Sequence, residues 1–234
     1  MVNVLAIGAH PDDIEIGCSG TLALHKLNKD KVYQLVLTKG EASGDPELRK
    51  KECETASEFL SIDKLYFGGL KDTMIKDGIE TITIIEDLIN KIKPDFIYTH
   101  TFMDTHQDHR NAAYATLSAA RKCKKIFMYE GPATLRNFVP QVFINIEKTF
   151  DIKKRVTRMF GSQSQKLYLA AEAVEGLARH RGYQCGLKVA EAFEVGKLVI
   201  DLNEFCRFPD KPKGKPCELC KNYVNGDNNS EFIS

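Results

Sequence analysis

The chain has 234 residues, with 33 Lys and Arg against 32 Asp and Glu, so its formal net charge is +1. This balance gives no electrostatic reason to expect binding to nucleic acid or to a membrane surface. The composition, 43% hydrophobic and 28% charged, is typical of a globular protein rather than a disordered one. No apolar run reaches the roughly 18 residues that a membrane span needs. The length fits one large domain with at most a small appendage.

Cysteine usage and the first residues favour a reducing compartment. The seven cysteines are an odd number in a chain that is long enough to bury a core without disulfides. The apolar start, from Met1 to Ile7, has no basic leader and runs into a His-Asp cluster, so it does not resemble a secretory signal. We therefore expect a cytoplasmic protein.

Strand and helix patterns alternate along the first 202 residues. Asp45 and Pro46 suit the N-cap and first turn of one of these helices. In chain order, we predict a strand at 4–9, a helix at 17–29, a strand at 33–38, a helix from 45 to about 59, a strand at 64–67, a helix at 79–92, a strand at 95–99, a helix at 109–121, strands at 126–129 and 141–146, helices at 148–159 and 166–180, and a strand at 195–202. This alternation predicts an α/β fold with a mostly parallel sheet and helices on both faces.

The last 32 residues differ in character from the rest. Residues 203–234 are rich in Pro, Lys, Gly and Asn, which predicts an irregular tail after a domain at 1–202. Cys217 and Cys220 have the spacing of half a zinc ribbon, and Cys206 lies nearby. A structural metal site and a loose reduced tail both stay open, and we favour the loose tail.

A first chemical cluster follows the first predicted strand. His10, Asp12 and Asp13 leave that strand end together. Burying two adjacent carboxylates is costly unless a cation or several donors compensate them. One carboxylate could bind a metal ion while its neighbour addresses a water molecule. The alternative is a turn in which the Asp residues cap the next helix.

A second cluster follows the fourth predicted strand. His106 and His109 are three residues apart, so at a helix start they can face the same way. Asp108 between them could fix the tautomer of an imidazole. A solvated polar loop is the alternative. Two histidines and one aspartate would make a three-ligand site with a vacant position, which is typical of catalytic zinc, although iron(II) accepts the same ligands.

Both clusters resemble motifs of one enzyme family. The run from His10 to Thr21 resembles the opening motif of the PIG-L/LmbE-like zinc de-N-acetylases, and the run from Asp104 to His109 resembles their second motif. The resemblance covers roughly residues 2–200, and Gln107 stands where the family often has proline. It implies a Rossmann-like α/β domain that removes acetyl from N-acetylglucosamine-type conjugates.

The resemblance also implies roles for individual residues. It implies that zinc is held by His10, Asp13 and His109. It implies that Asp12 is the general base for water, and that His106, oriented by Asp108, stabilises the oxyanion or protonates the leaving amine. Arg49 matches the family's substrate-binding arginine, whereas from its position alone we would expect a surface ion pair.

Two further residues are weaker candidates. Glu130 follows a predicted strand on the side of the sheet where such folds bind ligands, so it can reach the sugar, or it can belong to a turn. Arg181 lies in a stretch that also resembles the family, and we favour an ion pair with Glu191 or Glu194 over a substrate contact.

We therefore predict a zinc-dependent hydrolase, with Fe²⁺ also open, that acts on the linear amide of a small N-acetyl amino sugar conjugate. The alternative is a non-catalytic module that binds metal or a partner through a degenerate site and the cysteine-containing tail. A nucleotide-binding oxidoreductase is rejected, because no Gly-x-Gly-x-x-Gly follows the first strand and carboxylates lie where a pyrophosphate would bind. We expect no nucleic-acid partner and no membrane span, and a homo-oligomer stays open.

Overall fold

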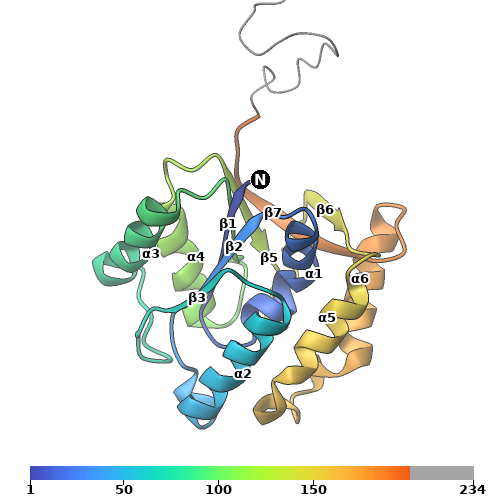
Figure 1. Ribbon diagram of the computed structural model, residues 1–234, viewed down its shortest axis with the longest axis horizontal. Coiled ribbons are helices and arrows are strands. Elements are labelled where there is room, and N and C mark those ends of the chain that lie inside the picture. Colours follow the sequence, from blue (N-terminus) through green and yellow to red (C-terminus); the bar gives the residue numbers. More distant parts are fainter. Residues whose placement is uncertain (201–234) are drawn as a thin grey trace, which may run out of the picture. The chain divides into compact units, whose positions relative to one another are not determined.

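A mostly parallel sheet forms the middle layer of residues 1–200, the part that the computed structural model describes (Figure 1). Its strands are β1 (Asn3–Gly8), β2 (Lys31–Val36), β3 (Lys64–Phe67), β4 (Phe96–His100), β5 (Lys125–Tyr129), β6 (Val142–Asn145) and β7 (Ala190–Leu198). They lie in the order β3-β2-β1-β4-β5-β7-β6. The first five run parallel, and β7 runs antiparallel to both β5 and β6.

The central strand β1 shows why both faces of the sheet are covered. It pairs with β2 on one side and β4 on the other, and its residues from Val4 to Ile7 are fully buried. Because side chains alternate along a strand, Val4 and Ala6 join one hydrophobic core while Leu5 and Ile7 join another on the opposite face. A strand buried on both faces needs a helical layer on each.

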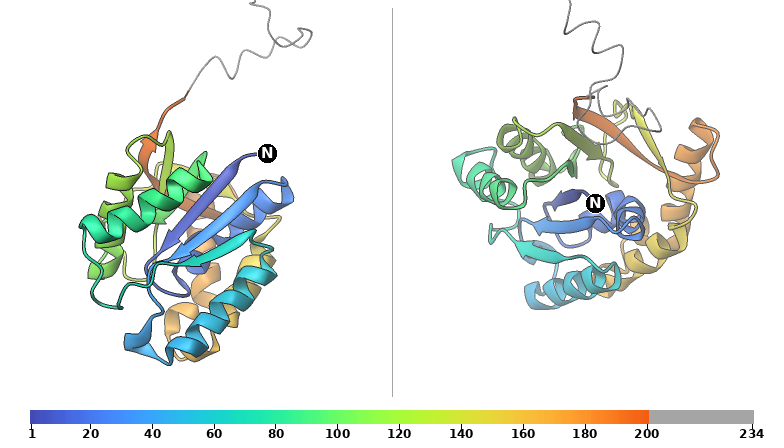
Figure 2. Two further views of the ribbon diagram at one scale, coloured as in Figure 1. Left: turned by 60° about the vertical axis from the view of Figure 1, so that its left-hand side comes forward. Right: turned by 45° about the horizontal axis from the view of Figure 1, so that its top comes forward.

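The helices supply these two layers, as Figure 2 shows. One core includes side chains of α1 (Asp13–Leu27), α2 (Pro46–Phe59) and α5 (Phe150–Val156). The other includes side chains of α3 (Ile79–Ile92) and α4 (Gln107–Ala119). The last helix, α6 (Ala171–Gln184), packs beside β6 and β7. The predicted Rossmann-like α/β fold is confirmed.

Several element bounds differ from the prediction. Helix α1 begins at Asp13 rather than 17, and α6 begins at Ala171 rather than 166. Strand β7 begins at Ala190 rather than 195, because pairing with β6 holds Ala190 to Phe193 in the sheet although alanine and glutamate are poor strand formers. The helix predicted at 148–159 is α5 followed by a short 3₁₀ turn at Thr157–Met159.

Helix α1 is broken at Cys18, where the backbone leaves helical geometry at φ −145° and ψ 16°. At the break, the backbone N–H groups of Gly20 and Thr21 donate to the carboxylate of Glu191, at 2.9 and 2.7 Å, instead of to a helical carbonyl. The Lys153 ammonium donates to the same carboxylate and to the Ile16 carbonyl. Glu191 therefore caps the second half of α1 from strand β7.

Residues 1–199 form one compact unit. The predicted boundary at 202 and the tail with Cys206, Cys217 and Cys220 lie outside the described residues, so they stay predictions. Within residues 1–200, no helix is both long enough and apolar enough to cross a membrane.

Candidate functional site

The fold brings the two chemical clusters together at one edge of the sheet. Strands β1 and β4 are parallel neighbours, so the residues after Gly8 and after His100 leave the same, carboxyl-terminal edge. The strand order reverses between these two strands, which is where open α/β sheets bind ligands. The predicted site residues on the two segments are therefore neighbours in space.

The side chains of His10, Asp13 and His109 converge, and Asp13 faces the two histidines through different carboxylate oxygens. His10 Nδ1 lies 3.2 Å from Asp13 Oδ2, and His109 Nε2 lies 3.3 Å from both Asp13 Oδ1 and His10 Nδ1. Ligands held at about 2.0–2.1 Å in a tetrahedral zinc site lie roughly 3.3–3.4 Å apart. The donor set and its spacing therefore fit a divalent metal ion.

Buried carboxylates lie behind both histidines. His10 Nε2 lies 3.0 Å from Asp72 Oδ1 and 3.3 Å from Asp108 Oδ2. His109 Nδ1 lies 3.1 Å from Asp104 Oδ2. A carboxylate on the far nitrogen orients a ligating imidazole and raises its basicity, as in many metal sites. Each imidazole thus turns its other nitrogen toward Asp13.

The pKa shifts show that this cluster needs positive charge. Burial alone would raise the pKa of Asp13, but His109, His100 and His10 lower it well below its ordinary value. Burial would likewise lower the pKa of His109, but Asp13 and Asp104 raise it to about 9. The buried carboxylates thus favour positive charge at His10 and His109, and a divalent cation would supply such charge.

Asp12 adjoins Asp13 and lines the same cavity, but its carboxylate faces Arg49. Its backbone is left-handed, with φ 107° and ψ −27°, and its Oδ1 lies 3.6 Å from Arg49 Nη2. Its Oδ2 is buried and has no hydrogen-bond partner among the described residues. Burial and the charge of Asp13 raise the pKa of Asp12 to about 7, against the opposing effect of Arg49. Such a carboxylate can accept a proton near neutral pH.

His106 caps helix α4 and is thereby fixed in one tautomer. Its Nδ1 accepts from the backbone N–H of Asp108 at 3.2 Å, so the neutral ring carries its proton on Nε2. Its own backbone N–H donates to Asp104 Oδ1 at 2.7 Å. Burial and the charges of His109 and His10 lower the pKa of His106. The ring is therefore a neutral hydrogen-bond donor.

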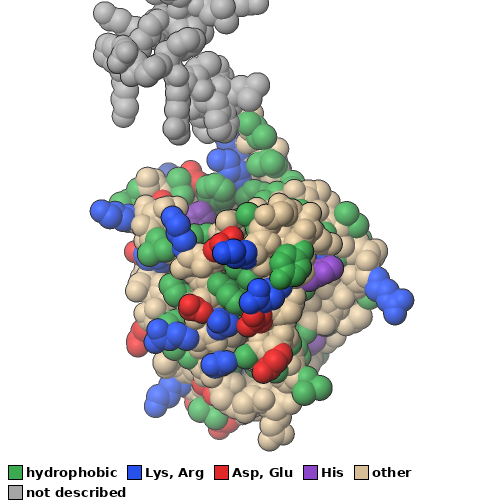
Figure 3. All heavy atoms as spheres, turned by 90° about the vertical axis from the view of Figure 1, so that its right-hand side faces the viewer, with side chains coloured by type: hydrophobic (Ala, Val, Ile, Leu, Met, Phe, Trp, Pro, Cys, Tyr) green, Lys and Arg blue, Asp and Glu red, His purple; other side chains and the backbone are tan. Residues whose placement is uncertain are grey.

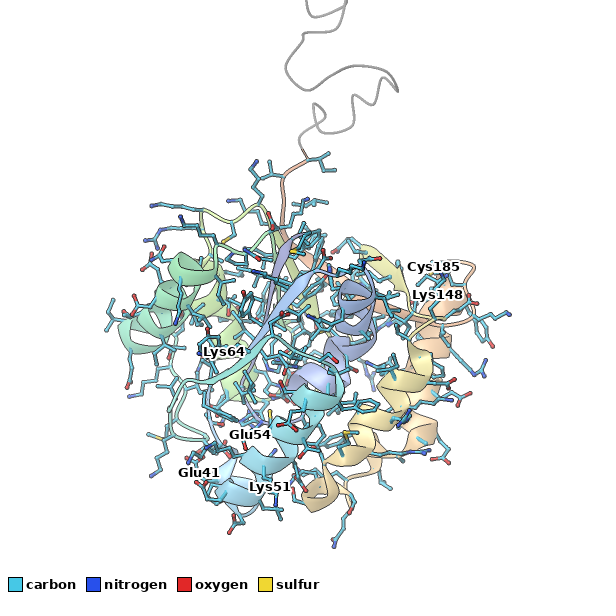
Figure 4. All side chains as sticks on the ribbon, in the orientation of Figure 1. Glu41, Lys51, Glu54, Lys64, Lys148 and Cys185 are labelled. Carbon is cyan, nitrogen blue, oxygen red and sulfur yellow. The ribbon has the colours of Figure 1, made fainter. Side chains whose placement is uncertain are left out.

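Asp108 contacts His106 through its backbone N–H and not, as we had expected, through its carboxylate. The contact runs through the backbone N–H, whereas the carboxylate faces His10 and accepts from the N–H groups of Thr73 and Ile75 at 2.7 and 3.2 Å. It thus ties the loop after β3 to the site. The carboxylate of Asp72 likewise accepts from a backbone N–H, that of Ala42, at 2.9 Å. The backbone N–H of Asp72 donates in turn to Glu41, which is labelled at the lower left of Figure 4.

Arg49 is buried rather than placed in a surface ion pair. Its Nη1 donates to the Gly40 carbonyl and to Ser43 Oγ, both at 2.7 Å, and its Nη2 donates to the Pro11 carbonyl at 2.8 Å. Gly40 has φ 69°, and a Cβ there would lie 1.9 Å from Arg49 Nη1. Arg49 therefore fixes the turn that carries Asp12, and its guanidinium requires glycine at position 40.

Glu130 and Arg181 form an ion pair with each other. Arg181 Nε and Nη2 each donate to a Glu130 carboxylate oxygen at 2.6 Å. The predicted pairing of Arg181 with Glu191 or Glu194 is wrong, because both carboxylates are already engaged. Glu191 caps α1, and Glu194 accepts from the Thr101 hydroxyl at 2.6 Å and from the N–H of Val139 at 3.0 Å.

A cavity of about 220 Å³ opens over these groups. Its lining includes most of the predicted site residues, namely His10, Asp12, Asp13, Arg49, His106 and His109. Asp108 lies beneath it, and Glu130 lines an adjoining cavity instead.

Comparison with known proteins agrees with this geometry. Residues 5–120 match the PIG-L family, described as GlcNAc-PI de-N-acetylase. The uncharacterized deacetylase YaiS of Escherichia coli (strain K12) is 36% identical over an alignment of 160 positions, which covers 64% of this chain and 85% of that protein. The chain belongs to the PIG-L family. The prediction of a deacetylase-type hydrolase is confirmed with it.

Two further relatives extend the match beyond residue 120. The diacetylchitobiose deacetylase of Thermococcus kodakarensis is 28% identical over 185 residues, 68% of this chain and 69% of that protein. The crystal structure of the conserved protein TT1542 from Thermus thermophilus superposes with a TM-score of 0.77 at 26% identity. This superposition covers 87% of this chain and 98% of that one.

Sequence reasoning missed two of the buried carboxylates. Asp104 was visible only as the first residue of the second motif, and its role depends on the turn that aims it at His109. Asp72 carries no local signal, because it reaches His10 from the loop after β3, 62 positions further along the chain. Lys166 and Tyr168, which line the same cavity, were predicted only as part of a helix.

Proposed function

We propose that the protein hydrolyses the acetamide of an N-acetylated amino sugar conjugate and releases acetate and the free amine. The observation that carries the proposal is the triad of His10, Asp13 and His109, with Asp12 lining the same cavity. Family membership and relatives that are deacetylases by name support it.

We propose zinc as the ion held by this triad, and Fe²⁺ suits the same two imidazoles and one carboxylate. When bound, such an ion would polarise the acetamide carbonyl and acidify a water molecule. Asp72, Asp108 and Asp104 would hold the two ligating imidazoles in place.

Two side chains would handle the protons and the developing charge. Asp12, which lines the cavity and whose pKa is raised to about 7, would take the proton of the attacking water. His106 would donate its Nε2–H to the carbonyl oxygen as negative charge develops there. Amine departure also needs a proton. Asp12 would deliver the proton that it took from water, whereas His106 would deliver one only from its imidazolium form.

Arg49 would bind the substrate in addition to stabilising the fold. Three of its donor contacts hold backbone and hydroxyl groups, while its buried Nε–H has no acceptor in the described chain. Because Arg49 lines the cavity, its guanidinium would contribute positive charge next to the bound substrate. Glu130, held by Arg181, lies farther along and would meet a more distant part of the conjugate.

A substrate panel tests this proposal. N-acetylglucosamine and several of its glycosides are incubated with the full chain, with zinc added or chelated, and released amine and acetate are quantified. We expect release that zinc supports and chelation abolishes. No release from any member would overturn the proposal and favour a non-catalytic binding module. A cytoplasmic location and a homo-oligomer remain part of the proposal, and fractionation and light scattering test them.

A further inference from the structure

A second cavity, of about 200 Å³, adjoins the catalytic one. The two cavities meet at three residues that line both of them, Ile16, Pro132 and Tyr168. We propose that this second cavity, called the apolar chamber below, binds an uncharged alkyl or aryl substituent carried by the same substrate. The inference rests on the proposed function, because it assigns the aglycone of the conjugate.

Most of the residues that line the apolar chamber are apolar, and several of them have small side chains. Helix α6 contributes Val174, Leu177 and Ala178, and strand β7 contributes Ala190 and Ala192 from one face. Alanine at these positions leaves space that larger residues would fill. Apolar surface of this kind gains free energy when a hydrocarbon group replaces water.

The charged groups that line the apolar chamber are paired with one another. Arg181 is bidentate to Glu130, and Lys153 donates to Glu191, whose oxygens also cap α1. The pairs cancel in charge, so the lining has no net attraction for an ionic ligand. A neutral apolar group therefore fits this chamber better than a phosphate or a carboxylate.

The rim of the apolar chamber is exposed. Leu177 is 38% exposed although it lines the cavity, and Ala173, one turn earlier, is exposed at the same face. Figure 3, which views the side that carries α5 and α6, shows hydrophobic side chains among charged ones there. A substituent can thus enter from solvent while the sugar lies in the catalytic cavity beyond Tyr168.

The test compares hexyl and methyl glycosides of N-acetylglucosamine in each anomeric configuration. We expect kcat/KM for at least one hexyl glycoside to exceed that of its methyl counterpart at least about tenfold, mainly through KM. Ala173→Trp, which fills the rim from an exposed position, should reduce this ratio to about one. The matched control Glu172→Trp lies on the same helix, is exposed and does not line the chamber, so it should keep the ratio.

A binding measurement separates this inference from the proposed function. Calorimetry with the hexyl α- and β-glucosides, which have no acetamide, should give for at least one anomer a Kd at least about fivefold weaker for Ala173→Trp than for Glu172→Trp. If this difference in Kd is found while no N-acetyl glycoside is hydrolysed, the proposed function is wrong but the proposed binding at the apolar chamber is supported. Hexyl-to-methyl ratios near one in the unmodified protein overturn the chamber. Equal hexyl-to-methyl ratios in Ala173→Trp and Glu172→Trp also overturn the chamber. This holds as well when the only effect of Ala173→Trp is a change in oligomeric state.

Discussion

Asp12 and Asp13 are adjacent in sequence but serve different parts of the site. The left-handed backbone of Asp12 turns the chain sharply just before α1, so its carboxylate faces Arg49 while Asp13 faces the histidines. This conformation costs about 1–3 kcal/mol for a residue other than glycine. Arg49, through the Pro11 carbonyl, and the first turn of α1 hold it in place.

Asp12→Asn should separate catalysis from metal binding. Asparagine tolerates the left-handed conformation and keeps the shape of the side chain, but it cannot accept the proton of water. We expect full metal content and a loss of turnover of about 10²–10⁴-fold. Metal analysis and initial rates check this, with Asp77→Asn at an exposed position as the control. Turnover within about twofold of the unmodified protein would remove Asp12 as the base.

Replacing His106 and replacing His109 should have different effects on turnover and on metal content. His106→Ala removes a neutral donor, so turnover should fall about 10²–10³-fold while bound metal stays stoichiometric. His109→Ala removes a ligand and should lose the metal itself. Elemental analysis of both purified variants measures the difference. Stoichiometric metal in His109→Ala would show that the proposed ligand set is wrong.

At the scale of elements, the site depends on how α1 and β7 meet. The break in α1 at Cys18 leaves two backbone N–H groups that only a distant residue can satisfy, and Glu191 reaches them from β7. Lys153 from α5 then neutralises the buried carboxylate. Three elements that are far apart in sequence are thus joined behind the catalytic turn.

Removing Glu191 should destabilise the protein strongly. Glu191→Ala leaves the Lys153 ammonium buried without its partner and uncaps the second half of α1. We expect a loss of about 3–5 kcal/mol of unfolding free energy, which lowers the Tm by roughly 10 °C in a domain of this size. Adding Lys153→Met should recover part of this loss, because no unpaired charge then remains. A double variant as unstable as the sum of the single ones would contradict the account.

Glu194→Ala is the matched control, because it also removes a buried carboxylate of β7. Glu194 accepts only from the Thr101 hydroxyl and the Val139 N–H, and no ammonium within the described residues pairs with it. Its loss should cost only about 1–3 kcal/mol. Thermal unfolding of the set, followed by circular dichroism, measures these differences.

At the scale of the whole molecule, local sequence patterns predicted the sheet and the two chemical clusters that follow its strands. Parallel strands share an edge, so His10 and His109 could be placed near each other from the amino-acid sequence alone. Asp72 could not, because its contact with His10 depends on the path of a loop with no motif of its own. The ion pair of Arg181 with Glu130 was also out of reach, since several carboxylates could satisfy the same guanidinium.

Metal removal should lower the stability of the entire domain. Asp13, Asp72, Asp104 and Asp108 lie close together only in the folded chain, so a divalent cation should bind the folded state far more tightly than the unfolded one. Free metal at about 100 times its Kd then adds about 2.7 kcal/mol of unfolding free energy. We expect this to raise the Tm by roughly 5–10 °C over chelated protein, as measured by calorimetry.

His109→Ala provides the control for this shift. The variant lacks one of the three proposed ligands, so its Tm should change by less than about 2 °C between zinc and chelator. A full shift that persists in the variant would place the stabilising ion elsewhere in the chain, and the cysteines at 206, 217 and 220 would then be the first residues to replace. A shift that disappears ties the metal to the site between β1 and β4, where the deacetylase chemistry is proposed.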